Sequence, residues 1–165
     1  MGCDIHLFAE VKKKKIFIDW LTFWKPKEWV SIDKWTKNKY YEEGNDDGEQ
    51  EYEIARDNRF YSGGRNYNLF CALCGVRSHS FRDSPNCISE PKGLPNDVSQ
   101  EVKEQSEIYG SDGHSHSWNT LKELRDFDWS GYGETTKCFL DEVIPKMAAQ
   151  NVKDSDVRIV YFFDN

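Results

Sequence analysis

The closing stretch of the chain constrains the fold more than any other, because residues 157–163 are apolar at every position except Arg158. A strand with apolar side chains on both faces usually lies in the middle of a sheet. Residues 3–11 are its natural neighbour, since apolar and polar side chains alternate along them with the two-residue period of a strand. The sequence therefore predicts a mainly antiparallel sheet that contains these two strands and a third at residues 16–19.

Helices are predicted to cover this sheet, and apolar stripes at helical spacing mark most of them. They are expected at residues 67–74, 98–109, 120–127 and 136–150. Asp97 with Gln100, and Thr120 with Glu123, have the spacing of capping boxes at two of the helix starts. We therefore expect an α+β fold, a single domain spanning residues 1–165.

Composition narrows the classes of partner. The net charge of -7 and the pI of about 5.1 disfavour a long nucleic-acid duplex but leave room for a small anionic ligand beside local arginines. No run of some 18 apolar residues is present, so we expect no membrane partner. The absence of a signal-peptide pattern and the odd count of five cysteines are typical of a soluble, cytoplasmic protein with reduced thiols.

Three of the four histidines fall in two short motifs, which makes them the first candidates for chemistry. Asp4 and His6 are spaced by two on the first strand, and His114 and His116 are spaced by two on a loop bounded by glycines. In extended backbone such pairs point to one side. We expect the two pairs to converge, either as acid–base catalysts or as ligands of one divalent metal ion.

A second interpretation of the same residues stays open. A single histidine is more often structural than functional, so His6 would be a hydrogen-bonded sheet residue and His114 and His116 a solvated loop. The gathering of scarce titratable residues in two matched pairs favours a site, because such residues tend to cluster where chemistry is done.

Five of the seven arginines lie between residues 56 and 82, around a predicted helix start. Arg65, just before this helix start, is a candidate for binding phosphate oxygens, because free N–H groups beside it favour an anion, and Arg77 is a second candidate for the same role. Tyr67 on the same helix and Trp118 after the histidines are candidates for contact with the ligand, Trp118 by stacking on a base. The alternative is that these arginines form surface ion pairs in an acidic protein.

Several stretches resemble a group of small phage and prophage proteins, most of them uncharacterised. The opening Met-Gly-Cys-Asp-Ile-His is the main likeness, and further ones lie at residues 65–77, 90–97, 112–118 and 156–160. Together they extend along the whole chain. The resemblance implies phage ancestry, and it suggests action in an infected bacterial cell against immune signalling by nucleotide messengers.

Two functions follow as hypotheses. The first is a phosphodiesterase that hydrolyses a small cyclic nucleotide, with His6, His114 and His116 as acid–base groups that each contribute about 10²–10⁴-fold, and with the arginines on the phosphate. A divalent metal ion held by Asp4 and the three histidines is the alternative to metal-free catalysis. The second function is a non-catalytic sponge that sequesters the nucleotide, often in a pocket shared between protomers of a homo-oligomer.

Overall fold

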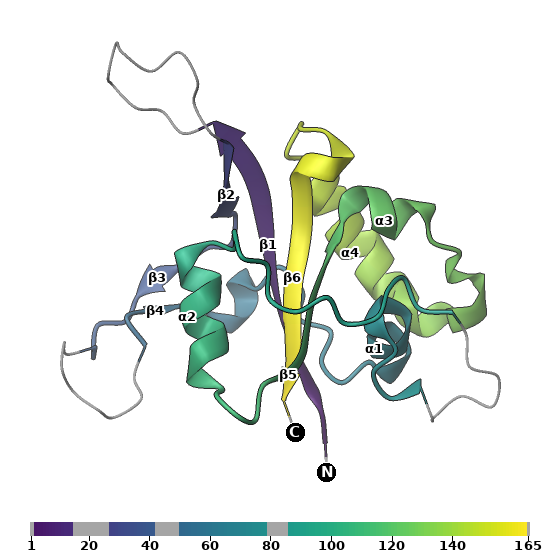
Figure 1. The fold of residues 1–165 in the computed structure, drawn as a ribbon, viewed down its shortest axis with the longest axis horizontal. Coiled ribbons are helices and arrows are strands. Elements are labelled where there is room, and N and C mark those ends of the chain that lie inside the picture. Colours follow the sequence, from purple (N-terminus) through teal and green to yellow (C-terminus); the bar gives the residue numbers. More distant parts are fainter. Residues whose placement is uncertain (1, 15–26, 42–49, 79–85, 165) are drawn as a thin grey trace.

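The central feature of the fold is a four-stranded antiparallel sheet with the order β2-β1-β6-β5 (Figure 1). The computed structural model describes residues 2–14, 27–41, 50–78 and 86–164. The strands are β1 (Asp4–Lys14), β2 (Lys27–Ser31), β5 (His114–Thr120) and β6 (Val157–Asp164). The prediction of a central closing strand beside the first strand is confirmed. The expected strand at 16–19 lies outside the described residues, and β1 pairs instead with β2.

Helices lie on both sides of this sheet, as the expected α+β class requires. They are α1 (Tyr67–Cys74), α2 (Gln100–Ile108), α3 (Leu121–Asp126) and α4 (Lys137–Ala148). Figure 1 shows α2 on one side of the sheet and the other three helices on the opposite side. A small second sheet pairs β3 (Thr36–Lys37) with β4 (Tyr52–Glu53) near α2, and a short 3-10 helix (Arg56–Asn58) follows it.

The alternating side chains of the strands divide the apolar core between the two faces. The larger cluster, against α1, α3 and α4, includes Leu7, Tyr161 and Phe163. The smaller cluster, against α2, contains Phe8, Val160 and Phe162. Because β6 contributes fully buried residues to both clusters, it is apolar on nearly every position.

Local signals in the sequence explain where the helices begin and end. In α1, the Asn66 side chain accepts a hydrogen bond from the Leu69 N–H, and Gly75 ends the helix at a φ of 76°. Thr120 and Glu123 form the expected capping box of α3. The expectation for α2 was wrong in detail: its N-cap is Ser99, because Asp97 is engaged by Arg158.

A buried ion pair ties the first and last strands together on the α2 face. The Arg158 Nε donates to the Glu10 Oε2 at 2.8 Å, and both side chains are almost completely excluded from solvent. The other oxygen of Glu10 accepts from the Ser99 N–H at 2.7 Å, which fixes the start of α2 against the sheet. The Arg158 guanidinium also lies 3.9 Å from the Trp29 ring centroid, a cation–π distance. This network holds α2 over the same sheet face that carries His6.

Candidate functional site

The alternation of β1 places Asp4, His6 and Phe8 on the sheet face that α2 covers. In the register of β1 with β6, Asp4 lies opposite Asp164, and His6 lies opposite Phe162. The strands are antiparallel, so the final residues of the chain return to its start. Asp164 therefore brings a second carboxylate beside Asp4 and His6.

His6 is held by one carboxylate and two aromatic rings. Its Nε2 donates a hydrogen bond to the Asp164 Oδ2 at 3.2 Å, and the side chain is 19% exposed. Its ring centroid lies 4.1 Å from that of Tyr109 and 4.9 Å from that of Phe162. An imidazole that donates from Nε2 keeps the lone pair of Nδ1 for accepting a proton. No hydrogen bond to that Nδ1 is found among the described residues.

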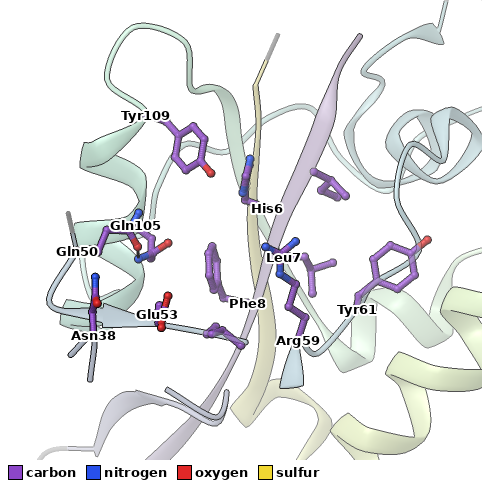
Figure 2. A pocket seen from close by; sticks show the side chains of 12 residues that line it. His6, Leu7, Phe8, Asn38, Gln50, Glu53, Arg59, Tyr61, Gln105 and Tyr109 are labelled. Carbon is purple, nitrogen blue, oxygen red and sulfur yellow. Dashed lines mark hydrogen bonds between the residues drawn. The ribbon is translucent and has the colours of Figure 1, made fainter. Parts of the chain in front are cut away.

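Two cavities open on His6, and both also have Ile5, Arg59 and Tyr61 in their walls. The first, of about 270 Å³, extends between β1, β4 and α2. Figure 2 shows its polar residues around Phe8, with Tyr109 at one end and Arg59 across Phe8 from Gln50, Gln105 and Glu53. The second, of about 410 Å³, extends over Asp4, Asp164, Arg56 and Gly64. We call the two together the His6 cavity.

Two guanidinium groups, those of Arg56 and Arg59, line the His6 cavity without an acidic partner in the part of the chain that the structure describes. Both residues are exposed and lie at the 3-10 helix that follows β4. Burial raises the pKa of the Tyr109 hydroxyl on the opposite wall, and the positive charge of Arg59 acts in the opposite direction. An unneutralised pair of arginines in an acidic protein is suited to a small anion.

The arginines that the sequence singled out have other partners. Arg65 forms a bidentate pair with Asp4, from Nε at 2.8 Å and from Nη2 at 3.0 Å. Hydrogen bonding from Arg65 lowers the pKa of Asp4 below its ordinary value. Arg77 lies over the ring of Tyr67 at 5.7 Å, and neither Arg77 nor Tyr67 lines the His6 cavity. For Arg65, the structure therefore agrees with the alternative interpretation, in which these arginines form surface ion pairs instead of binding phosphate.

The second histidine pair does not converge as expected, because residues 114–120 form strand β5 rather than a loop. A bulge between His114 and Ser117 shifts the register, and Ser115 has a φ of 51° in the left-handed region. His114 consequently stacks on Phe163, on the face of α1, α3 and α4, at 6.0 Å. His116 stacks on Phe162, on the α2 face, at 5.1 Å. The prediction that both imidazoles point to one side is wrong.

His116 shares the Phe162 ring with His6 but does not line the His6 cavity. A hydrogen bond of 2.8 Å joins its Nε2 to the Ser106 Oγ of α2. Burial, and secondarily the nearby His114, lower the pKa of His116 below its ordinary value. A neutral imidazole packed between a helix and a sheet is a hydrogen-bonded structural residue, so His116 supports α2 rather than the cavity.

Trp118 lies at the far end of the same sheet face. It is opposite Val160 in β6, and the ammonium group of Lys92 lies 4.1 Å from its ring centroid. It lines a different cavity of about 550 Å³ together with Trp29 and Arg158. Trp118 is therefore separate from the groups around His6.

The four residues expected to hold a metal ion are divided between two faces. Asp4 is bound by Arg65, His6 by Asp164, and His114 stacks on the opposite side of the sheet from His116. Within the described ranges, no group of three or more His, Cys, Asp or Glu residues is arranged to hold a metal ion. The expected ligand set is thus not assembled in this structure.

Sequence reasoning missed Asp164, Tyr109 and Arg59 as members of the site. A signal for Asp164 was available, because an antiparallel partner of residues 3–11 must bring the last residue of the closing strand beside Asp4. Tyr109 and Arg59 carried no such signal, since their place depends on how α2 and the segment after β4 pack against the sheet.

Comparison with protein-family models, with curated proteins and with solved structures found no match. Among the helices of the described residues, none has the length and apolar character that a membrane span requires.

Proposed function

We propose that the His6 cavity binds a small phosphate-bearing nucleotide and that His6, with Asp164, hydrolyses its phosphodiester bond. One observation carries the proposal: an imidazole oriented by a carboxylate opens on the same cavity as Arg56 and Arg59, which no carboxylate of the described residues neutralises. The proposal is supported because a proton acceptor and two guanidinium groups, which are suited to phosphate oxygens, line one space.

The chemistry follows from these groups. Asp164 accepts a hydrogen bond from the Nε2–H of His6 and, still ionised, stabilises the imidazolium that forms when Nδ1 takes a proton from water. The water oxygen bonds to phosphorus while one P–O ester bond breaks, and the guanidinium groups stabilise the charge on the phosphoryl oxygens. The leaving oxygen takes a proton from the Tyr109 hydroxyl, which the imidazolium later restores through solvent. The raised pKa of Tyr109 keeps that hydroxyl protonated at neutral pH.

Sequestration without cleavage is the second candidate, and one observation favours it. Among the described residues, His6 is the one imidazole that lines the His6 cavity, because His116 is bonded to Ser106 and His114 lies on the other face of the sheet. A site with one histidine lacks the matched base and acid of the expected mechanism, while its arginines remain able to hold phosphate.

The resemblance of the sequence to phage proteins suggests which nucleotides to test first. Cyclic nucleotides that act as bacterial immune messengers are small and multiply anionic, and they suit a cavity with two arginines in a protein of net charge -7. The proposed setting is the cytoplasm of an infected bacterium, and the proposed ligand is a free nucleotide rather than a duplex.

The experiment that separates the two functions is incubation of the protein with cyclic mononucleotides and cyclic dinucleotides, followed by chromatography. Linear products support the phosphodiesterase. Intact nucleotide that co-purifies with the protein and is recovered after denaturation supports sequestration. A parallel reaction with a chelator tests whether hydrolysis depends on a divalent metal ion. If no nucleotide is bound or cleaved, the proposed ligand class is wrong.

A further inference from the structure

We infer that the nucleotide taken by the His6 cavity carries a guanine base, and that the Glu53 carboxylate recognises it. This inference rests on the proposed function and adds the identity of the base. It starts from a division within the cavity: Arg59 lies across Phe8 from a group of amide and carboxylate side chains (Figure 2). A ligand that fills this space meets positive charge at one end and hydrogen-bond acceptors at the other.

The two opposite charges of the first cavity, Glu53 and Arg59, do not pair with each other. No salt bridge or side-chain hydrogen bond engages either one among the residues that the structure describes. The backbone of Glu53 is fixed by the β3–β4 pairing, in which its carbonyl accepts from the Thr36 hydroxyl at 3.2 Å. An unpaired carboxylate repels phosphate, so the phosphate belongs at the Arg59 end, and the base belongs near Glu53.

Amide side chains next to Glu53 complete the recognition surface. Gln105 of α2 donates to the Tyr52 carbonyl at 3.3 Å and to the Gln50 side-chain carbonyl. These bonds use the Gln105 N–H groups and the Gln50 oxygen, so they leave the Gln50 N–H groups as donors and the Gln105 oxygen as an acceptor on two residues that line the cavity. The wall therefore offers a carboxylate flanked by an amide donor.

Guanine is the base that matches this wall. It presents two adjacent donors, N1–H and the N2 amino group, beside the O6 acceptor. The two oxygens of Glu53 accept from both donors, and a Gln50 N–H donates to O6. Adenine presents one amino donor beside its N1 acceptor. One oxygen of the Glu53 carboxylate can accept from the amino group, but the other would face the N1 lone pair and be repelled. Hypoxanthine lacks the amino group and loses one of the two bonds.

The test measures dissociation constants by calorimetry for the cyclic monophosphates of guanosine, inosine and adenosine. The wild-type protein is compared with Glu53→Gln, which converts one acceptor into a donor. Glu51→Gln is the matched control, because Glu51 is a neighbouring carboxylate that pairs with Lys37 at 3.3 Å and does not line the His6 cavity. Thermal melting verifies that both variants fold.

Wild-type protein and Glu51→Gln are expected to bind the guanosine nucleotide about tenfold more tightly than the inosine nucleotide. This is the affinity that one additional charge-assisted hydrogen bond contributes at an exposed site. Glu53→Gln is expected to lose this preference and to favour the adenosine nucleotide. Equal binding of the three nucleotides by the wild type, or an unchanged preference in Glu53→Gln, overturns the guanine assignment while the proposed function stands. Absence of binding to all three and to cyclic dinucleotides instead removes the proposed function.

Discussion

His6 and Asp164 are 158 positions apart in the sequence, yet the Nε2 of one lies 3.2 Å from the Oδ2 of the other. The antiparallel pairing of β1 and β6 brings them together, because it sets the last strand residue beside the first. The same pairing places the Asp164 Oδ1 within 3.2 Å of the Asp4 N–H, which fixes the carboxylate from both sides. A carboxylate held in this way orients the imidazole toward the cavity that Arg59 lines.

Replacing this carboxylate tests its part in hydrolysis. Asp164→Asn keeps an acceptor for the Asp4 N–H but removes the charge that stabilises a protonated His6. We expect kcat for nucleotide hydrolysis to fall about 10²-fold or more, while the dissociation constant changes by only a few-fold, since the arginines are intact. Steady-state kinetics with a separate binding measurement verify this. An unchanged kcat rules out a catalytic pair of His6 and Asp164.

The two carboxylates around Arg158 allow a matched test of what buried charge contributes to stability. Glu10 is fully buried, whereas the Asp97 side chain is 62% exposed, although each lies within 2.9 Å of the guanidinium. We expect Glu10→Gln to lower the free energy of unfolding by about 3 kcal/mol, because it leaves a buried cation without its main partner. Asp97→Asn is expected to cost less than about 1 kcal/mol. Urea denaturation measures both, and equal losses contradict the role of burial.

Asp33 is expected to make stability depend on pH in the acidic range. Burial raises its pKa to about 6, against hydrogen bonds from the Ala9 N–H and the Ser31 hydroxyl that lower it. Between pH 4 and pH 6 the unfolded chain ionises this group before the folded protein does, so stability falls as the pH rises and then levels off. A pKa difference of two units corresponds to at most about 3 kcal/mol.

The variant Asp33→Asn removes this titration. Its stability relative to the wild type is expected to increase between pH 4 and pH 7, by up to about 3 kcal/mol, as measured by urea denaturation at each pH. The exposed carboxyl of Asp57 provides the control, and Asp57→Asn is expected to follow the wild type across the same range. A constant difference between Asp33→Asn and the wild type contradicts the raised pKa.

Much of the architecture could be predicted because short-range patterns determine it. Three sequence patterns indicated elements that the structure contains: the alternation of residues 3–11, the apolar run at 157–163 and the capping box at Thr120. The strand at 27–31 was not predicted, because it is short and its sequence Lys-Glu-Trp-Val-Ser lacks the apolar alternation of a strand. The predicted N-cap of α2 was wrong because Asp97 instead accepts a hydrogen bond from Arg158 of β6.

The site was only partly predictable, because its geometry depends on deviations from regular structure. The two-residue spacing rule correctly placed Asp4 and His6 on one face, but the bulge at Ser115 separates His114 from His116. A single residue in the left-handed region is enough to reverse a side chain, and no glycine marked it. Tertiary packing likewise determines which arginines line the cavity: it pairs Arg65 with Asp4, whereas no carboxylate of the described residues forms an ion pair with Arg59.

The central claim, that the His6 cavity holds a phosphate-bearing nucleotide, is tested most directly by nucleotide affinity in the double variant Arg56→Ala/Arg59→Ala. Arg125→Ala is the control, because Arg125 pairs with Asp154 and does not line the cavity. The dissociation constant for the cyclic nucleotide that binds wild-type protein most tightly is expected to rise about a hundredfold in the double variant and to stay unchanged in the control. Equal affinity in the wild type and the double variant, or no nucleotide binding by the wild type, would contradict the claim.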